Sequence, residues 1–280
     1  MLLAYRIVNV FTQHGGRLTG NPLCVFEDGR GLTDEQMLAL ALQFNLSETT
    51  FISASDKADA RVRIFTPSYE MPFAGHPTLG TAHVVNSIKK LNGNVKLELN
   101  VGVIPVSGDG NRWELRANSA TTRTPSASTG ELAAALGLQE SDVSGPSLWV
   151  NSGSEQLIVP LASEDAVRRV RISYEWLKRA TQDGPRAQAY VFATTGTDTL
   201  LSRFFFSKGE SLLEDPATGS ATANLGGWYL ANSTLLPLTK TISQGELCGR
   251  PSTLRLRIDM ENNVFVAGEV LELGSGTVDL

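Results

Sequence analysis

The chain has 280 residues, of which 41% are hydrophobic and 19% are charged, and its formal net charge is −5. This composition is typical of a soluble globular protein with room for one large domain or two ordinary ones. No apolar run approaches the roughly 20 residues of a membrane-spanning helix, and no cluster of Lys and Arg indicates nucleic-acid binding. We therefore expect neither a membrane nor a nucleic acid as partner.

The N-terminus and the cysteines indicate the compartment. The charge of Arg6 comes too early for a signal-peptide core. Two thiols, Cys24 and Cys248, give no disulfide framework in so long a chain and fit a reducing compartment. We expect a cytoplasmic protein. The three histidines are too scattered for a histidine-rich metal site, so no metal is expected.

The first half of the chain is predicted to contain two helices of different character. Thr33 and Gln36 form a capping box ahead of a peripheral helix. A polar loop, Asn45–Thr50, then leads into a strand at 51–53. Residues 78–85 are small and apolar on nearly every side, which indicates a helix that is buried all round.

The remaining elements are mostly strands, and they suggest a second copy of the same plan. Residues 95–101 and 254–259 alternate apolar and polar side chains, as strands with one wet face do. Residues 221–228 are again small and apolar, like the first buried helix. Between the copies, the polar stretch Asn118–Thr129 is the best boundary.

One short motif occurs twice, once in each half. Glu70–His76 and Glu214–Ser220 share Glu, Pro and Gly at the same spacing, and an Arg-x-Phe precedes each copy. We predict an α+β fold of two pseudo-symmetric lobes, each a curved, mostly antiparallel sheet or barrel around a buried central helix. Residues 1–120, completed by a strand at 271–280, form the first lobe, and residues 121–270 form the second.

The two turns before the buried helices are candidates for binding an anion. A helix N-terminus carries unpaired N–H groups and about half a positive charge, so two such ends could hold a carboxylate without Lys or Arg. The alternative is that Pro and Gly only shape the turns. His76 at the first helix end is either a neutral hydrogen-bonding group or a structural cap. Asp215, before the second helix, suits a hydrogen-bonding partner or an orienting group.

Glu48 is a third candidate, but its neighbours in the sequence do not single it out. It lies in a polar loop, unpaired by any nearby Lys or Arg. A glutamate in a loop is most often a solvated surface group. The local sequence therefore leaves its role open.

Six segments, in this order, resemble the PhzF (phenazine-biosynthesis-like) family of the diaminopimelate-epimerase-like fold. Each segment alone is a weak signal, whereas all six in order are specific. They run from near the N-terminus to Ser252: Gly20–Pro22, Asn45–Phe51, Arg63–Pro67, Glu70–Gly80, Glu214–Ala221 and Gln244–Ser252.

The resemblance implies a homodimeric isomerase without cofactor or metal, with its active site in the cleft between the lobes. The implied substrate is a small unsaturated carboxylate such as trans-2,3-dihydro-3-hydroxyanthranilate. Glu48 resembles the general acid/base that moves a proton between carbons. His76 and Asp215 resemble its catalytic partners, which orient the substrate or relay protons. The implied substrate-binding residues are Ser47, Gly75, Gly219 and Ser220.

Two other functions stay open at this point. An epimerase or racemase of an amino or hydroxy acid would place two opposed bases at the helix ends, as relatives of this fold do with two cysteines. Cys24 and Cys248 lie outside both turns, which argues against two thiols, and Cys248 is interpreted as a buried or incidental thiol. The chain could also be a non-catalytic small-molecule binder of the same fold. The natural substrate and pathway are not determined by the motifs.

Overall fold

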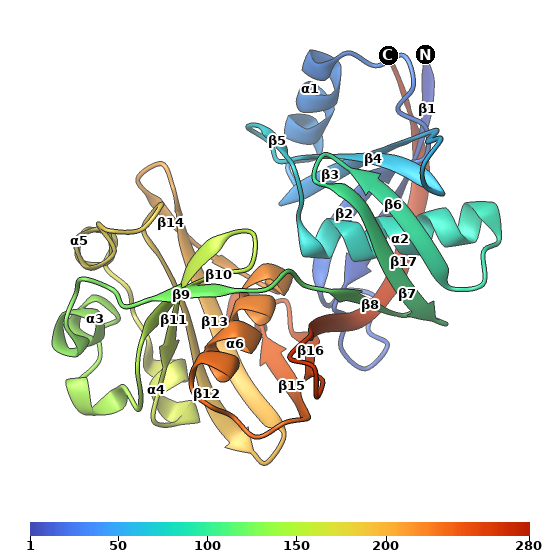
Figure 1. The fold of residues 1–280 in the computed structure, drawn as a ribbon. Coiled ribbons are helices and arrows are strands. Elements are labelled where there is room, and N and C mark those ends of the chain that lie inside the picture. The colour runs from blue at the N-terminus through green and yellow to red at the C-terminus, as the bar shows by residue number, and fades with distance from the viewer. The chain divides into compact units, whose positions relative to one another are not determined.

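The computed structural model describes all 280 residues, and they form two compact units. Unit 1 comprises Met1–Arg116 and Ala267–Leu280, and unit 2 comprises Ala117–Val266. The last strand therefore returns to unit 1 from Ala267, whereas the sequence suggested 271. None of the helices is both long and apolar enough to cross a bilayer. Each unit contains strands around one long helix (Figure 1).

Eight strands of unit 1 pair in a closed ring around helix α2. The ring runs β1–β2–β3–β4–β6–β7–β8–β17 and back to β1, and the pairs β2–β3 and β4–β6 are parallel. Its elements are β1 (Leu2–Val10), β2 (Asn21–Phe26), α1 (Asp34–Phe44), β3 (Glu48–Ser53), β4 (Ala60–Phe65), β5 (Glu70–Met71), α2 (Gly75–Lys89), β6 (Asn94–Leu99), β7 (Gly102–Asp109), β8 (Arg112–Arg116) and β17 (Val264–Asp279).

Unit 2 repeats this pairing. Strands β9–β10–β11–β12–β13–β15–β16 are adjacent in that order, and only β11–β12 and β13–β15 are parallel. Its elements are β9 (Thr121–Arg123), α3 (Thr129–Ala135), a 3-10 turn (Glu140–Asp142), β10 (Leu148–Asn151), β11 (Glu155–Pro160), α4 (Glu164–Arg169), α5 (Tyr174–Ala180), β12 (Gln188–Gly196), β13 (Thr199–Lys208), β14 (Ser211–Asp215), α6 (Gly219–Ala231), β15 (Leu238–Gln244), a second 3-10 turn (Glu246–Cys248) and β16 (Ser252–Ile258).

Each central helix is buried on nearly all sides, as the small apolar residues predict. Helix α2 packs against seven strands of its ring, and α6 packs against β9, β10, β11 and β16. Small residues allow this close approach: a Cβ at Gly80 would lie 2.6 Å from Leu23 Cδ2, and one at Gly226 would lie 2.5 Å from Val264 Cγ1. The predicted fold class is confirmed in both units.

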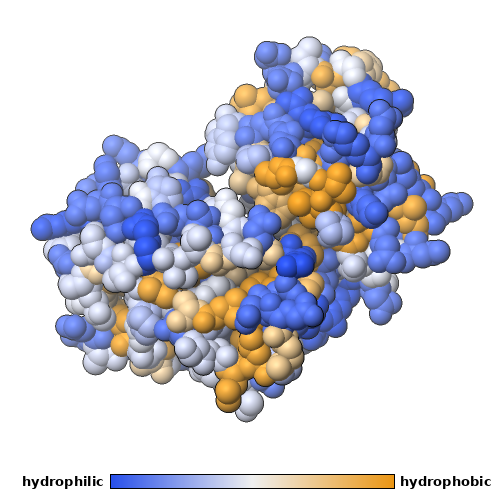
Figure 2. All heavy atoms as spheres, in the orientation of Figure 1, coloured by the Kyte–Doolittle hydropathy of each residue, from blue (hydrophilic) through white to orange (hydrophobic).

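The outer faces of the sheets carry a second apolar layer. In unit 1, helix α1 covers a buried cluster that includes Phe26, Phe51 and Phe65, and Thr33 caps this helix together with Gln36 as predicted. In unit 2, helices α3, α4 and α5 contribute to the corresponding cluster. The face seen in Figure 2 is hydrophilic over much of its area, with apolar patches on both units.

The duplicated motif forms the same ion pair in both units. Arg63 on β4 binds Glu70 on β5, with contacts of 2.8 and 2.6 Å, and Arg203 on β13 binds Glu214 on β14 with contacts of 2.9 and 2.8 Å. Each guanidinium also stacks on the phenylalanine two residues later. Such two-point contacts hold the β-hairpin that leads to each central helix.

His83 gives unit 1 a pH-dependent stability. Its Nδ1 accepts a hydrogen bond of 3.1 Å from Trp113 Nε1, and burial lowers the pKa of this imidazole. The unfolded chain therefore binds this proton more readily than the folded one, so stability is full above about pH 6.5 and falls as the pH drops below it. His83→Gln, which keeps an acceptor, should reduce this loss in urea unfolding at pH 7.5 and 5.5. An unchanged pH slope would contradict the role of His83.

Candidate active site

Glu48 and His76 lie together in unit 1, although 28 residues of chain separate them. Glu48 opens β3 and His76 is the second residue of α2. His76 Nδ1 is 3.1 Å from Glu48 Oε2, and the two side chains are 6% and 17% exposed. The two atoms are close enough for an ion pair, but their alignment does not make a hydrogen bond. Glu48 Oε2 and His76 Nε2 are both buried without a hydrogen-bond partner.

Unpartnered buried polar atoms are costly, so they indicate a place where a ligand completes the bonding. Glu48 is thus not the solvated surface carboxylate that its loop suggested. The strand pairing explains this: Glu48 pairs with Leu23 of β2, and β3 is hydrogen-bonded on both sides. A sequence window cannot show this pairing, because its partners come from other parts of the chain.

The two central helices begin without a side-chain cap, as α5 also does. Side chains cap α1, α3 and α4, whereas Ala74 and Thr218 at the starts of α2 and α6 provide no capping hydrogen bond. Neither first turn contains an acidic residue. The positive charge and the N–H groups of these two helix ends are therefore not compensated by a capping side chain or by a carboxylate of the first turn.

Asp215 ends β14 in unit 2, and a small network fixes the turn that follows it. The Thr218 hydroxyl donates to the Asp215 carboxylate. Gln244 Nε2 donates to the Asp215 carbonyl at 2.9 Å and to Thr218 Oγ1 at 3.0 Å. Gly219 and Ser220 begin α6, and Ser220 Oγ accepts a hydrogen bond of 2.9 Å from Gln156. Asp215 is therefore an anchored carboxylate rather than a free one.

The predicted residues thus fall into two groups, one in each unit. Unit 1 contains Glu48, His76, Gly75 and an exposed Ser47, and unit 2 contains Asp215, Gly219 and Ser220. Residue-level reasoning missed Thr218, Gln244 and Gln156. The first two belong to the recognised segments, but only the folded chain brings them to Asp215.

The duplication shows that Glu48 and His76 of unit 1 have no ionisable counterparts in unit 2. The phenylalanines of the two Arg-x-Phe copies have strand partners at Thr49 and Ala189: Phe65 pairs with Thr49, and Phe205 pairs with Ala189. The residues just before these partners, Glu48 and Gln188, therefore correspond to each other. The helix motif likewise matches His76 with Ser220. An acid and a base in unit 1 are replaced by an amide and a hydroxyl in unit 2. The fold therefore supplies one titratable pair, not two.

The thiols do not lie at the helix ends. Cys24 is buried beneath α1, and burial raises its pKa to about 12. Cys248 is exposed on the 3-10 turn Glu246–Cys248, and its pKa is raised mainly by desolvation. Of the two interpretations of Cys248, a buried thiol or an incidental one, the first is therefore wrong. Neither thiol belongs to the first turn of α2 or α6, where a two-thiol mechanism needs them.

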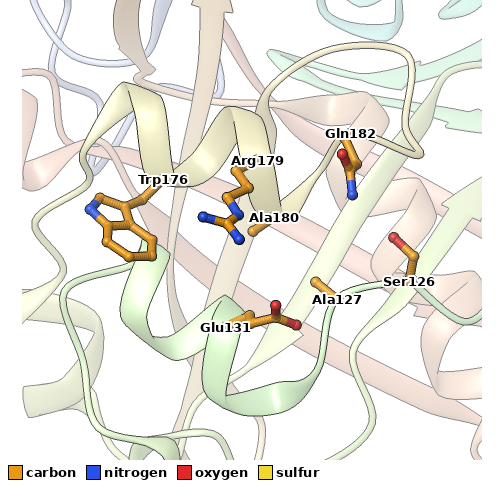
Figure 3. A pocket seen from close by; sticks show the side chains of 7 residues that line it. All are labelled: Ser126, Ala127, Glu131, Trp176, Arg179, Ala180 and Gln182. Atoms are coloured by element: carbon orange, nitrogen blue, oxygen red, sulfur yellow. The ribbon is translucent and has the colours of Figure 1, made fainter.

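A pocket of about 350 Å³ lies elsewhere on unit 2, between α3 and α5 (Figure 3). None of its lining residues belongs to the predicted site. Its one carboxylate, Glu131, accepts hydrogen bonds from the Ser128 backbone and hydroxyl and so serves as part of a helix cap. Its size alone gives it no chemistry, and we place the candidate site at Glu48 and the helix ends instead.

Two similar units, each with strands around a buried helix, have the diaminopimelate-epimerase-like fold, which solved structures of a hydroxyproline epimerase and a probable proline racemase share. The model of the PhzC-PhzF family, described as phenazine biosynthesis-like protein, matches residues 8–274. The chain belongs to this family and is an isomerase.

Relatives extend over nearly the whole chain. An uncharacterised isomerase of Pasteurella multocida is 36% identical, covering 98% of this chain and 93% of its own. The trans-2,3-dihydro-3-hydroxyanthranilate isomerase of Pseudomonas aeruginosa is 34% identical, covering 95% and 94%. The crystal structure of the PhzF-family protein of Bacillus anthracis matches with a TM-score of 0.88 at 24% identity, covering 100% of both chains.

Proposed function

We propose that this chain is a one-base isomerase in which Glu48 moves a proton along an unsaturated, carboxylate-bearing small molecule. The observation that carries the proposal is the half-buried Glu48 carboxylate beside His76, with one oxygen left unpartnered. Relatives named trans-2,3-dihydro-3-hydroxyanthranilate isomerase, at 33 to 34% identity, support that compound or a close analogue as substrate.

The chemistry needs only side chains and backbone. The Glu48 carboxylate takes a proton from carbon, the electron pair moves along the conjugated system, and the protonated Glu48 returns the proton at the far end. A base within hydrogen-bond reach and shielded from water is what this step requires. His76 Nε2, which has no protein partner, is available to bond the substrate and stabilise charge on it.

We propose that the residues of unit 2 act on the same substrate molecule. Asp215, held by Thr218 and Gln244, would accept hydrogen bonds from substrate N–H or O–H groups. Ser47, Gly75, Gly219 and Ser220 would bind the substrate, and the free N–H groups at the starts of α2 and α6 would hold its carboxylate. No step of this scheme uses a metal or a cofactor.

Turnover in deuterated water tests the reaction class. With trans-2,3-dihydro-3-hydroxyanthranilate we expect the double bonds to shift and a hydrogen to appear at a new carbon, with deuterium incorporated at that carbon only. Washout with inversion of one centre and no double-bond shift would show an epimerase. Binding of the compound without exchange would show a non-catalytic binder.

We also propose a cytoplasmic homodimer. Two free cysteines and no disulfide support a reducing compartment. Light scattering on the purified chain tests the assembly: a mass of one chain, 30.1 kDa, would contradict the dimer.

A further inference from the structure

A chain of buried hydrogen bonds, which we call the relay, leads from the β10–β11 loop to Ser220. Ser152 N and Oγ donate to Asn224 Oδ1 at 2.9 and 2.7 Å. Asn224 Nδ2 donates to the Ser154 carbonyl and to Gln156 Oε1, both at 2.8 Å. Gln156 Nε2 then donates to Ser220 Oγ at 2.9 Å. Gln156 is 2% exposed and Asn224 is fully buried.

The backbone fixes the direction of every bond in this chain. A backbone N–H can only donate and a carbonyl can only accept, so Ser152 N and Ser154 O leave one orientation for the Asn224 amide. Asn224 must then donate to Gln156, and Gln156 must present its NH₂ group to Ser220. Because Ser220 Oγ already accepts this bond, its own proton is directed to another acceptor.

Unit 1 shows that the fold does not need these polar residues. The repeated motif aligns Asn224 with Gly80. Ile158 pairs with Tyr190, so Gln156, two residues earlier on the parallel strand, is level with Gln188. Leu23 pairs with Glu48, the counterpart of Gln188, and therefore corresponds to Gln156. Gly80 and Leu23 simply pack against each other. Burying two amide side chains is costly unless all their hydrogen bonds are made. In unit 1, residues without polar side chains occupy the same two positions of the fold. A functional role for the relay accounts for this difference.

We propose that Gln156 and Asn224 are positioning residues that make Ser220 a hydrogen-bond donor to the substrate carboxylate. With the free N–H groups at the start of α6, the subsite then presents donors and selects an anion. This inference rests on the proposed function only in taking a carboxylate as the ligand.

Gln156→Glu tests the direction of the relay with nearly the same shape. The ionised carboxylate of this variant still accepts from Asn224 but must also accept the Ser220 proton, which turns the lone pairs of Ser220 toward the ligand. Two probes are compared by calorimetry: 3-hydroxyanthranilate and 2-aminophenol, the same ring without the carboxylate. We expect the preference for the carboxylate probe to fall by about tenfold to a hundredfold.

The loss should depend on pH, which a purely structural defect would not produce. Once protonated, the introduced carboxyl group can donate to Ser220 as glutamine does, and burial favours the protonated form. Relative to the parent at the same pH, the preference of Gln156→Glu should therefore be nearly equal at pH 5 and fall progressively toward pH 9. A preference that equals the parent's at every pH would overturn the proposal.

Two further variants distinguish a reversed hydrogen bond at Ser220 from the general effect of an added negative charge. In a Ser220→Ala background, Gln156→Glu should have little additional effect, and an undiminished effect would overturn the role of Ser220. Gln188→Glu places a carboxylate at another buried glutamine of the same unit, 1% exposed, and should leave the probe preference unchanged. A parent that does not prefer the carboxylate probe also overturns the assignment. The deuterium experiment tests the proton transfer by Glu48 separately, so either proposal can be contradicted while the other stands.

Discussion

Glu48→Gln is expected to lower turnover by about 10²- to 10⁴-fold, because the amide cannot accept the carbon-bound proton. The change keeps the shape of the side chain and its place at the start of β3, so the substrate should still bind with little change in KM. Steady-state turnover of trans-2,3-dihydro-3-hydroxyanthranilate, followed by absorbance, measures the effect.

The control for this variant is Glu35→Gln in the first turn of α1, an exposed carboxylate outside the site. Its turnover should equal that of the parent. A Glu48→Gln protein that remains folded by circular dichroism and turns over within a few fold of the parent would remove Glu48 as the base. The one-base mechanism would then fail with it.

Gly245→Ala is expected to destabilise unit 2 by about 2–5 kcal/mol. Gly245 has a φ of +80°, which costs a residue with a Cβ about 1–2 kcal/mol. An added Cβ would also lie 2.3 Å from the Arg250 carbonyl and 2.4 Å from the Pro216 carbonyl, and relieving such overlap costs about 1–3 kcal/mol more. Pro216 follows Asp215 directly, so activity should fall as well. Urea unfolding at neutral pH measures the loss.

Gly249 is the matched control, because it has the same backbone conformation in open space. Its φ is +79°, and no atom lies within 4 Å of an added Cβ. Gly249→Ala should therefore cost only the conformational part, about 1–2 kcal/mol, and leave turnover unchanged. Equal losses for the two variants would contradict the close approach of Gly245 to the turn at Asp215.

Some parts of the site could be read from the sequence because their signals are local. The helix starts at Gly75 and Gly219 follow from Pro/Gly turns ahead of small apolar runs, and the alternation in β16 follows from its one wet face. His76 and Asp215 were found because each lies close in sequence to such a helix start. Glu48 was found by resemblance alone, since its own loop resembles a solvated one.

Other features depend on residues that are far apart in the chain. The contact of Glu48 with His76, the bonds from Gln244 to the Asp215 turn, and the relay from Asn224 to Ser220 all join separate elements. Whether a polar side chain is buried or exposed depends on its strand neighbours, which propensity and periodicity do not identify. For this reason the sequence did not decide between a buried and an incidental thiol at Cys248, which is exposed.

The duplicated plan, the two buried helices and the family could all be inferred from the amino-acid sequence, because they depend on spacing and on side-chain size within short windows. The folded chain was needed to show that the titratable pair occurs in unit 1 alone, and that Asp215 and Ser220 are held by partners from other strands. The physical reason is that ionisation and hydrogen-bond direction depend on burial and on the atoms across each contact.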